Sequence, residues 1–373
     1  MTVKRLLLIL YVAGASLLLG GCRGQLASGH RDMEHLRPVQ TVGLDAEGET
    51  VILSVSSGIG PDGAAPLVMT AAASGIETAA ARLQDWSPED ELFFAHVRYI
   101  LLGESMVGGD RIDRVLDWVE RSPAMRMDTP LILVKGRAEE AVSGSLGEAT
   151  DVTERLGSLE RERVSQGESL PTLRQTAGSL LERGWALCLA AELYPDEGTN
   201  LTEAENGVAI VPAGLALLRR EEGRDVADTV WLTKNESMGA ALLTRTVTGA
   251  KVTAGDSALE ILRSGVRISG LWSGDGALTG VYIRCRLTAG VLERGGEEDD
   301  DAVTAVLEEA AAGWLLEAAA RAQALGCDFL GLEDAVLKNA PRGASVAWDE
   351  VFPTLPVTAA VTAEIGSGYD LAG

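Results

Sequence analysis

The chain has 373 residues, enough for two or three domains, and 46% of them are hydrophobic, so sizeable cores can be buried. Only 4% are aromatic, so those cores must consist mainly of Leu, Val, Ile and Ala. The formal net charge of -23 repels nucleic-acid phosphate and argues against a DNA- or RNA-binding role. It also argues against attachment to an anionic membrane by electrostatics alone, so any membrane anchor must be apolar.

The N-terminus has the pattern of a secretory signal peptide, which we assign to residues 1–21. Lys4 and Arg5 form a short basic start, and an apolar stretch without charge follows over residues 6–21. This stretch is short for a membrane-spanning helix, which needs about 20 residues, but it fits the apolar region of a signal peptide. It ends in Leu-Gly-Gly-Cys at residues 19–22, which resembles a lipobox.

The cysteine of this motif is the one candidate site residue. We predict cleavage between Gly21 and Cys22, with a diacylglycerol on the Cys22 thiol. Two acyl chains, at about 0.8 kcal/mol per buried CH2, anchor a protein stably where one chain does not. Residues 22–35 would then form a lipidated tether to the membrane. The alternative is an ordinary signal peptide, or an uncleaved anchor, with a chance cysteine.

The N-terminal region, residues 36–200, is predicted to mix strands and helices. Two short strands, Val39–Leu44 and Thr50–Ser56, surround a Gly-containing turn and indicate a hairpin. An Ala-rich helix ending near Leu83 follows. An apolar run over residues 91–103 indicates a buried strand.

A helix over Asp110–Arg121 comes next, because four apolar residues form one stripe at helical spacing. Those four are Ile112, Val115, Leu116 and Val119. Further along we expect a short strand, a charged helical stretch and an apolar strand, over 131–134, 151–183 and 185–193. Pro and Gly between residues 195 and 198 break the pattern, so we place a domain boundary near 195–205.

The C-terminal region, residues 201–373, begins with an apolar run over Val208–Leu218 that Pro212 and Gly214 interrupt, which indicates a hairpin. The remaining elements are an alternating strand, a long helix and a last alternating strand, over 281–287, 302–325 and 357–365. Strands with one polar face favour mixed or antiparallel sheets packed with helices over a doubly wound parallel sheet. The predicted fold class is therefore α+β, in more than one domain.

No group of residues indicates catalysis, a metal or a cofactor. His30 and His35 lie in the tether, and we interpret His96, in the predicted buried strand, as a core or structural residue. The motifs HExxH, GxxxxGK[ST] and GxSxG, and a strand-anchored GxGxxG, are absent. The acidic tract at 297–301 lacks the alternating ligands of an EF-hand, and we interpret it as a helix start. The sequence therefore predicts a non-enzymatic protein.

The three cysteines after Cys22 form no CxxC pair, which leaves a zinc site or a thioredoxin-like motif without support. We interpret Cys285 and Cys327 as small core residues rather than as a disulfide. Whether Cys188 pairs with either of them cannot be decided from spacing.

Several short motifs follow one another in a characteristic order along the chain. After Cys22, the segment 38–45 ends in Gly-x-Asp, and F-x-H at 94–96 is followed by Gly-Glu at 103–104. The next block is R-x-P at 121–123 and then Lys-Gly at 135–136. Late in the chain, a long helix precedes the sequence CDFLGL at 327–332, then Trp348 and the last alternating strand. This order resembles the Ger(x)C (GerAC-type) family, the C-subunit lipoproteins of spore germinant receptors.

The resemblance implies a fold of three α/β units and a specific setting. Such proteins are made during sporulation and lie, lipid-anchored, on the outer face of the inner spore membrane. They act with a multi-spanning A subunit and a permease-like B subunit, which together sense nutrients and trigger germination. The alternatives are a solute-binding lipoprotein of a transporter, which would need two doubly wound lobes, and a lipid-anchored cell-wall hydrolase.

Overall fold

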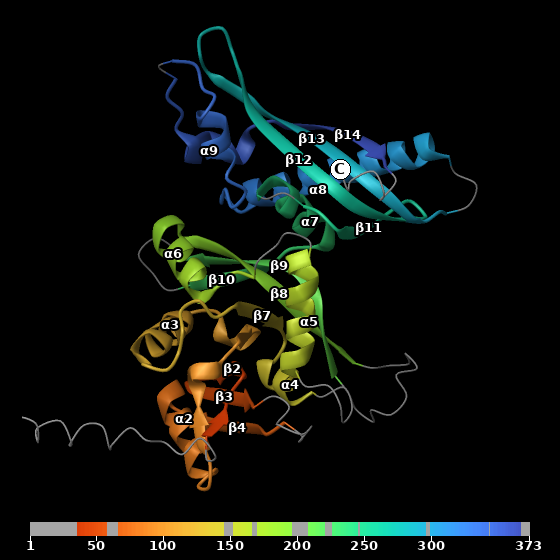
Figure 1. Ribbon diagram of the computed structural model, residues 1–373. Helices are drawn as coiled ribbons and strands as arrows, with labels where there is room; N and C mark the ends of the chain where they lie inside the picture. Colours follow the sequence, from red (N-terminus) through yellow and green to blue (C-terminus); the bar gives the residue numbers. More distant parts are fainter. Residues whose placement is uncertain are drawn as a thin grey trace, which may run out of the picture.

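Two sheets of different construction organise the chain, and Figure 1 shows them at opposite ends of an elongated body. This computed structural model describes residues 36–57, 66–144, 152–165, 170–195, 208–220, 226–244, 247–295, 299–342 and 344–366. The predicted signal peptide, Cys22 and the tether lie outside the described residues.

The N-terminal sheet has eight strands in the order β10-β9-β8-β7-β6-β2-β3-β4. Its four central strands, β8, β7, β6 and β2, run parallel, and the strands on both sides are antiparallel. The strands are β2 Thr41–Glu47, β3 Thr50–Ser56, β4 Val68–Ala73, β6 Tyr99–Gly103, β7 Leu131–Lys135, β8 Trp185–Pro195, β9 Val208–Arg220 and β10 Val226–Trp231. The predicted hairpin of the first two strands is confirmed as β2 and β3.

Helices cover both faces of this sheet, which explains why its central strands read as continuous apolar runs. One face packs against α2, α3 and α6, and the other against α4 and α5. These helices are α2 Ile76–Asp85, α3 Arg111–Arg121, α4 Ala138–Ser143, α5 Val152–Ser165 and α6 Leu173–Arg183. The apolar stripe predicted for 110–121 is confirmed, since Ile112, Val115 and Val119 are all buried.

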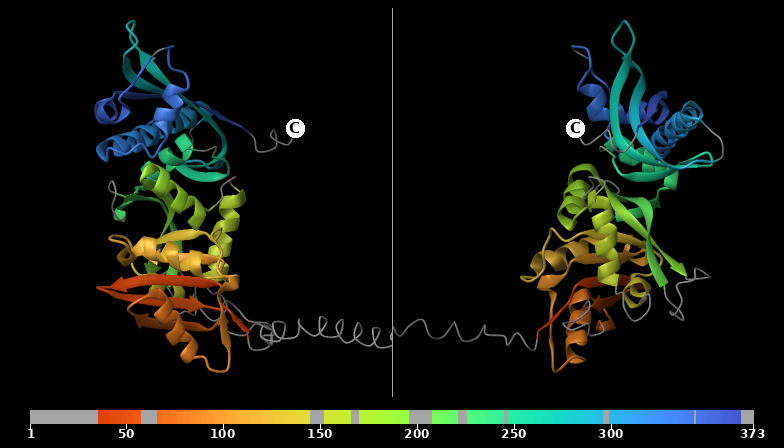
Figure 2. Two further views of the ribbon diagram at one scale, coloured as in Figure 1. Left: turned by 90° about the vertical axis from the view of Figure 1, so that its left-hand side faces the viewer. Right: turned by 45° about the vertical axis from the view of Figure 1, so that its right-hand side comes forward.

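The C-terminal sheet has four strands in the order β11-β12-β13-β14, with β14 parallel to β13 and the other pairs antiparallel. Its strands are β11 Ala250–Ala254, β12 Ser257–Trp272, β13 Leu278–Glu293 and β14 Val357–Ile365. Figure 2 shows its helices gathered on one side. They are α7 Lys234–Thr244, α8 Asp300–Ala324, α9 Leu332–Leu337 and α10 Trp348–Val351, followed by the 3-10 turn η6 Phe352–Thr354.

The long helix α8 begins at the acidic tract, as predicted. Asp299 is its N-cap, and its side chain accepts a hydrogen bond of 2.9 Å from the backbone N–H of Ala302. Asp300 and Asp301 follow in the first turn, where the helix dipole favours negative charge. The acids at 297 and 298 lie outside the described residues.

Strand β9 joins the two regions through its side chains. Ala216 and Leu218 pack into the core of the N-terminal sheet, whereas Leu215 and Leu217 pack into the core of the C-terminal region. The predicted hairpin over 208–218 is therefore wrong, because the run is one continuous strand. A register shift at Pro212 accommodates the proline, and Gly214 takes a φ of 85°.

The expected boundary near 195–205 falls between β8 and β9, which are paired neighbours in one sheet. The division of the chain into 36–200 and 201–373 therefore separates two strands that hydrogen-bond to each other. As a division into folding units it stays a prediction.

The buried strand predicted over 91–103 is confirmed at its end, as β6, but it does not run through the whole segment. The chain forms a short strand β5, Glu91–Phe93, which pairs with β1, Leu36–Pro38, then a 3-10 turn η4, Phe94–His96, and only then β6. The register requires this break, because Pro38 pairs with Phe93 and Thr41 pairs with Tyr99, which leaves extra residues that the turn takes up. His96 is exposed and stacks edge-on against Phe93 at 5.5 Å, so it is not a core residue.

Candidate functional site

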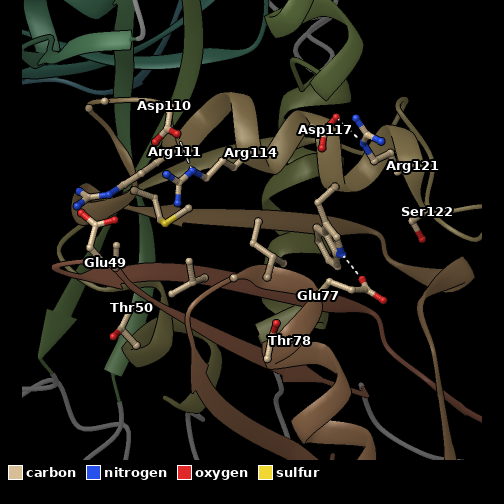
Figure 3. Close-up of a pocket in the computed structure, with 18 of the residues that line it drawn as sticks. Glu49, Thr50, Glu77, Thr78, Asp110, Arg111, Arg114, Asp117, Arg121 and Ser122 are labelled. Carbon is tan, nitrogen blue, oxygen red and sulfur yellow. Dashed lines mark hydrogen bonds and ion pairs between the residues drawn. The ribbon is translucent and has the colours of Figure 1, made fainter.

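A groove with apolar lining opens in the N-terminal region between the β2–β3 turn, the start of α2 and the length of α3 (Figure 3). Its volume is about 800 Å³. Val51, Ile76 and Met106 contribute apolar lining, and charged side chains line it along α3. The groove therefore offers apolar and polar surface together, as small-molecule sites do.

Helix α3 supplies most of the charge in the groove. Its buried stripe fixes the helix on the sheet, which leaves its arginines on the groove side. Arg114 pairs with Asp110 and Arg121 pairs with Asp117, each at 2.7 Å and four residues apart. Two of the three arginines that line the groove therefore have a carboxylate partner.

Two further contacts fix the walls of the groove. Arg111 donates hydrogen bonds to the carbonyl oxygens of Ser105, at 2.8 Å, and Gly48, at 2.9 Å, and so ties the β2–β3 turn to α3. The indole N–H of Trp118 donates to Glu77 Oε2 at 3.0 Å and ties α3 to α2. The groove is thus preformed by contacts between three elements that are distant in sequence.

The side-chain hydrogen bonds of the groove join arginines and a tryptophan to carboxylates, and none of them joins a hydroxyl or thiol nucleophile to a base. In the described part of the chain, no three His, Cys, Asp or Glu side chains gather in a way that could hold a metal ion. The groove therefore offers a preformed surface to a ligand or a partner segment.

Three of the motifs that carry the resemblance, Gly-x-Asp, Gly-Glu and Lys-Gly, meet at Asp45. Asp45 is 1% exposed, and its carboxylate accepts hydrogen bonds from the backbone N–H groups of Ala138, at 3.0 Å, and Glu139, at 2.7 Å. It therefore caps α4. Burial raises the pKa of the Asp45 carboxyl above its ordinary value, although both backbone hydrogen bonds lower it.

One glycine of these motifs makes room for this carboxylate, and a second allows the backbone turn beside it. A Cβ at Gly103 would overlap Asp45 Oδ1 and would lie 3.0 Å from the backbone nitrogen of Ala138. Gly136 takes a φ of 106°, which other residues rarely adopt. The Gly-x-Asp, Gly-Glu and Lys-Gly motifs therefore form one structural unit.

The C-terminal motif at 327–332 has the same kind of role. Asp328 accepts hydrogen bonds from the backbone N–H groups of Leu332, at 3.0 Å, and Glu333, at 2.7 Å, and so caps α9. Burial raises the pKa of the Asp328 carboxyl as well. Gly331, at a φ of 70°, lets the chain turn into the helix. Trp348, which follows, is buried and stacks on Phe352 at 5.2 Å.

The sequence-based site residues divide into three groups. Cys22 and Gly21 lie outside the described residues, and His96 lies on the surface. The R-x-P block at 121–123 lines one end of the groove. Trp118 and Arg111 were missed, although the repeated Asp and Arg four residues apart in α3 mark a polar face opposite its apolar stripe.

The cysteines of the described residues are free. Cys188 and Cys285 are buried and Cys327 is half-buried, which confirms the interpretation of Cys285 and Cys327 as core residues rather than as a disulfide. Burial raises the pKa of the Cys188 thiol to about 12 and those of Cys285 and Cys327 to about 11. None of the three is a reactive thiolate at neutral pH.

The helices within the described ranges include none that combines the length and the apolar character needed to cross a membrane. The fold and the groove together define a mixed α+β protein with a preformed groove and two structural carboxylates.

Comparison with known proteins makes this class specific. Residues 29–188 match the spore germination protein N-terminal domain, and residues 213–368 match the domain described as spore germination B3/GerAC like, C-terminal. The chain therefore belongs to the GerAC family of spore germination proteins, the germinant-receptor subunits that its motifs resemble.

The fold is similar to that in "Crystal Structure of the GerBC protein", with a TM-score of 0.52 and 14% sequence identity. The similarity covers 87% of this chain and 97% of that chain, so it extends over both sheets. No match is found among curated proteins. Nothing in these comparisons supports a transporter lipoprotein, and the mixed sheets differ from the two doubly wound lobes that such a protein requires.

Proposed function

We propose that this protein is a non-enzymatic C subunit of a spore germinant receptor. In this proposal a lipid on Cys22 holds it on the outer face of the inner spore membrane, where it binds a multi-spanning A subunit and a permease-like B subunit. The observation that carries the proposal is the tandem match of both GerAC-type domains, over 29–188 and 213–368. A lipobox at 19–22 directly precedes them.

The geometry of the groove also supports a binding role. The groove beside α3 is preformed, Arg114 and Arg121 in it are paired, and its apolar lining offers surface to a ligand or a partner segment. The motifs shared with the family serve the fold at Asp45 and Asp328 rather than a reaction. These features fit a subunit that binds the other receptor subunits better than a subunit that catalyses a reaction.

The test compares wild type with Cys22→Ala in a spore-forming host. We expect wild type to carry a diacylglycerol mass on Cys22, to fractionate with the inner spore membrane and to co-purify with the A and B subunits. The variant should lose the lipid mass and the membrane fraction, and its spores should germinate poorly with nutrients. Cys327→Ala removes a cysteine that needs no lipid and is the matched control. Wild type that is free in solution, or bound to neither subunit, would contradict the proposal.

A further inference from the structure

The outer face of the C-terminal sheet carries a cluster of arginines. Along β13, the inward residues are buried against the helices, and the residues between them point outward. The exposed outward positions include Arg263 and Arg267 on β12 and Arg284 and Arg286 on β13. We call these four residues the arginine face.

The strand register brings these charges together. Arg267 lies directly opposite Arg284, Arg286 lies opposite Gly265, and Arg263 lies opposite Thr288. Directly opposed side chains have Cβ atoms about 4.5–5.5 Å apart, so two like charges in this position destabilise the sheet. Fold stability alone would not place two arginines there.

The four guanidinium groups have no ion-pair partner among the described residues. Some arginines elsewhere do, including Arg37, Arg121, Arg126 and Arg137, whereas exposed arginines without an ion-pair partner, such as Arg174, lie apart from one another rather than grouped on adjacent strands. On the arginine face, only Arg284 has an aromatic contact, with the ring of Tyr282 at 5.7 Å. In a chain of net charge -23, unpaired arginines concentrated on one face are a departure from the rest of the surface.

The arginine face is open to a partner. A Cβ added at Gly265 would meet nothing within 4 Å, so the surface between the arginines is uncovered. Beside it lies a shallow hollow of about 550 Å³ lined by Arg263, Arg286 and Thr362. Glu364 at its rim accepts a hydrogen bond from Thr288 Oγ1 at 3.2 Å. Glu364 belongs to β14. On β12 the carboxylate of Glu260 lies opposite Lys251 in the register, and among the described residues neither carboxylate forms an ion pair with the four arginines.

The chemistry of guanidinium groups specifies what fits here. The planar fork of arginine matches a carboxylate with two parallel hydrogen bonds, and arginine is less strongly hydrated than lysine. The complement of this face is therefore a surface rich in Asp and Glu.

The position of the face favours a protein over the lipid surface. Figure 1 places β12 and β13 at the opposite end of the body from β3 and β4, and β1 at residue 36, where the described chain starts, pairs with β5 in the N-terminal region. A lipid on Cys22 would attach to the chain 14 residues before β1. It would hold the N-terminal end at the membrane and would not by itself bring the arginine face onto the headgroups.

We propose that the arginine face docks onto an acidic segment of a membrane subunit of the germinant receptor. This inference rests on the proposed function and adds the surface and the chemistry of the contact.

The experiment uses the full-length, lipidated protein in spores and measures co-purification of the A and B subunits from solubilised membranes. The double variant Arg267→Glu/Arg284→Glu should reduce co-purification by about tenfold or more, because reversed charges repel an acidic partner. Arg174→Glu/Arg342→Glu changes the net charge equally at two exposed arginines outside the face, and should co-purify like wild type. Arg267→Thr/Arg284→Thr removes the opposed charges, so it should fold at least as well as wild type and still co-purify less.

A photo-reactive residue shows what lies against the face. Thr362 is opposite Arg286 in the register, so Thr362→p-benzoylphenylalanine samples the partner directly. Adducts with the A or B subunit support the proposal. Adducts with lipid, or no adduct in membranes where wild type co-purifies, would overturn it. Undiminished co-purification of both arginine-face variants would also overturn it, whereas failure of wild type itself to co-purify would refute the proposed function instead.

Discussion

The two sheets of this protein use their surfaces differently. The N-terminal sheet is covered by helices on both faces, its central strand β6 is buried at every residue, and the charges of the groove beside it are paired along α3. The C-terminal sheet is covered on one face, and its other face carries four unpaired arginines. The difference indicates that the N-terminal sheet is a closed scaffold with binding surface at its edge, whereas the C-terminal sheet itself presents a surface.

Both regions nevertheless contain the same type of helix cap. A buried aspartate caps a six-residue helix in each, Asp45 at α4 and Asp328 at α9. A six-residue helix is too short to be stable alone, so its orientation depends on such a cap and on packing. The surroundings differ, because Asp45 lies against Gly103 in the sheet, whereas Asp328 lies in a turn before Gly331.

The largest expected difference between the sheets comes from adding one methyl group to a glycine in each. Gly103→Ala would force the new Cβ into Asp45 Oδ1 and against the α4 backbone, so we expect a loss of about 3 kcal/mol in the free energy of unfolding. Gly265→Ala enters open space and should change that free energy by less than about 0.5 kcal/mol. Urea unfolding followed by circular dichroism measures both. Equal losses would show that the outer face of the C-terminal sheet is covered.

Removal of the two caps tests whether the regions depend on them equally. Asp45→Ala and Asp328→Ala each leave two backbone N–H groups without their acceptor, and we expect each to lower the free energy of unfolding by about 2 kcal/mol. Because β9 contributes to both cores, each variant should shift one common unfolding transition. Two separate transitions, each moved by only one variant, would instead show that the sheets unfold independently.

The ionisation of Asp45 gives a smaller, pH-dependent effect. Burial is the main reason why the folded-state pKa of Asp45 lies above 3.8. The folded protein therefore binds this proton more tightly than the unfolded chain does. The resulting contribution to the free energy of unfolding is complete below the unfolded pKa and is lost as pH rises through the folded pKa. Asp45→Asn cannot ionise. The free energy of unfolding of wild type minus that of the variant should therefore fall across this window and stay constant above it. Urea unfolding of both proteins at a series of pH values measures it, and a difference that rises with pH would contradict the expected shift.

The smallest effect tests the opposed arginines. Arg267→Thr removes one of two like charges from a directly paired position, so we expect a gain of about 0.5 kcal/mol in the free energy of unfolding at low salt. The gain should shrink in high salt, because exposed charges are screened. Thermal unfolding at two ionic strengths checks both points. A loss of stability at low salt would mean that Arg267 has a favourable contact in the folded protein.

Local periodicity predicted much of the secondary structure. The stripe of α3, the acidic start of α8 and the alternation of β13 and β14 were all readable, because each repeats within one element. The alternation also marked Arg284 and Arg286 as outward. The position of Arg284 opposite Arg267 could not be predicted from the sequence, since it depends on the register of β12 against β13.

Long-range pairing accounts for most of what sequence reasoning missed. An apolar run over 91–103 looks like one strand, and only its pairing with β1 at one end and β2 at the other shows why it must break. Pro212 looked like the turn of a hairpin, because a register shift in the neighbouring pairing cannot be seen in one segment. The groove was missed for the same reason, as three separate elements build it. The net charge of -23, in turn, concealed a basic face.

Strand β9 has a mechanical consequence for such a molecule. Its alternate side chains belong to two cores, so a force applied at the C-terminal sheet is carried by a single backbone into the N-terminal sheet. We therefore expect a small tilt imposed on one end of the body to rotate the other end with it, so that the two sheets move as one rigid unit.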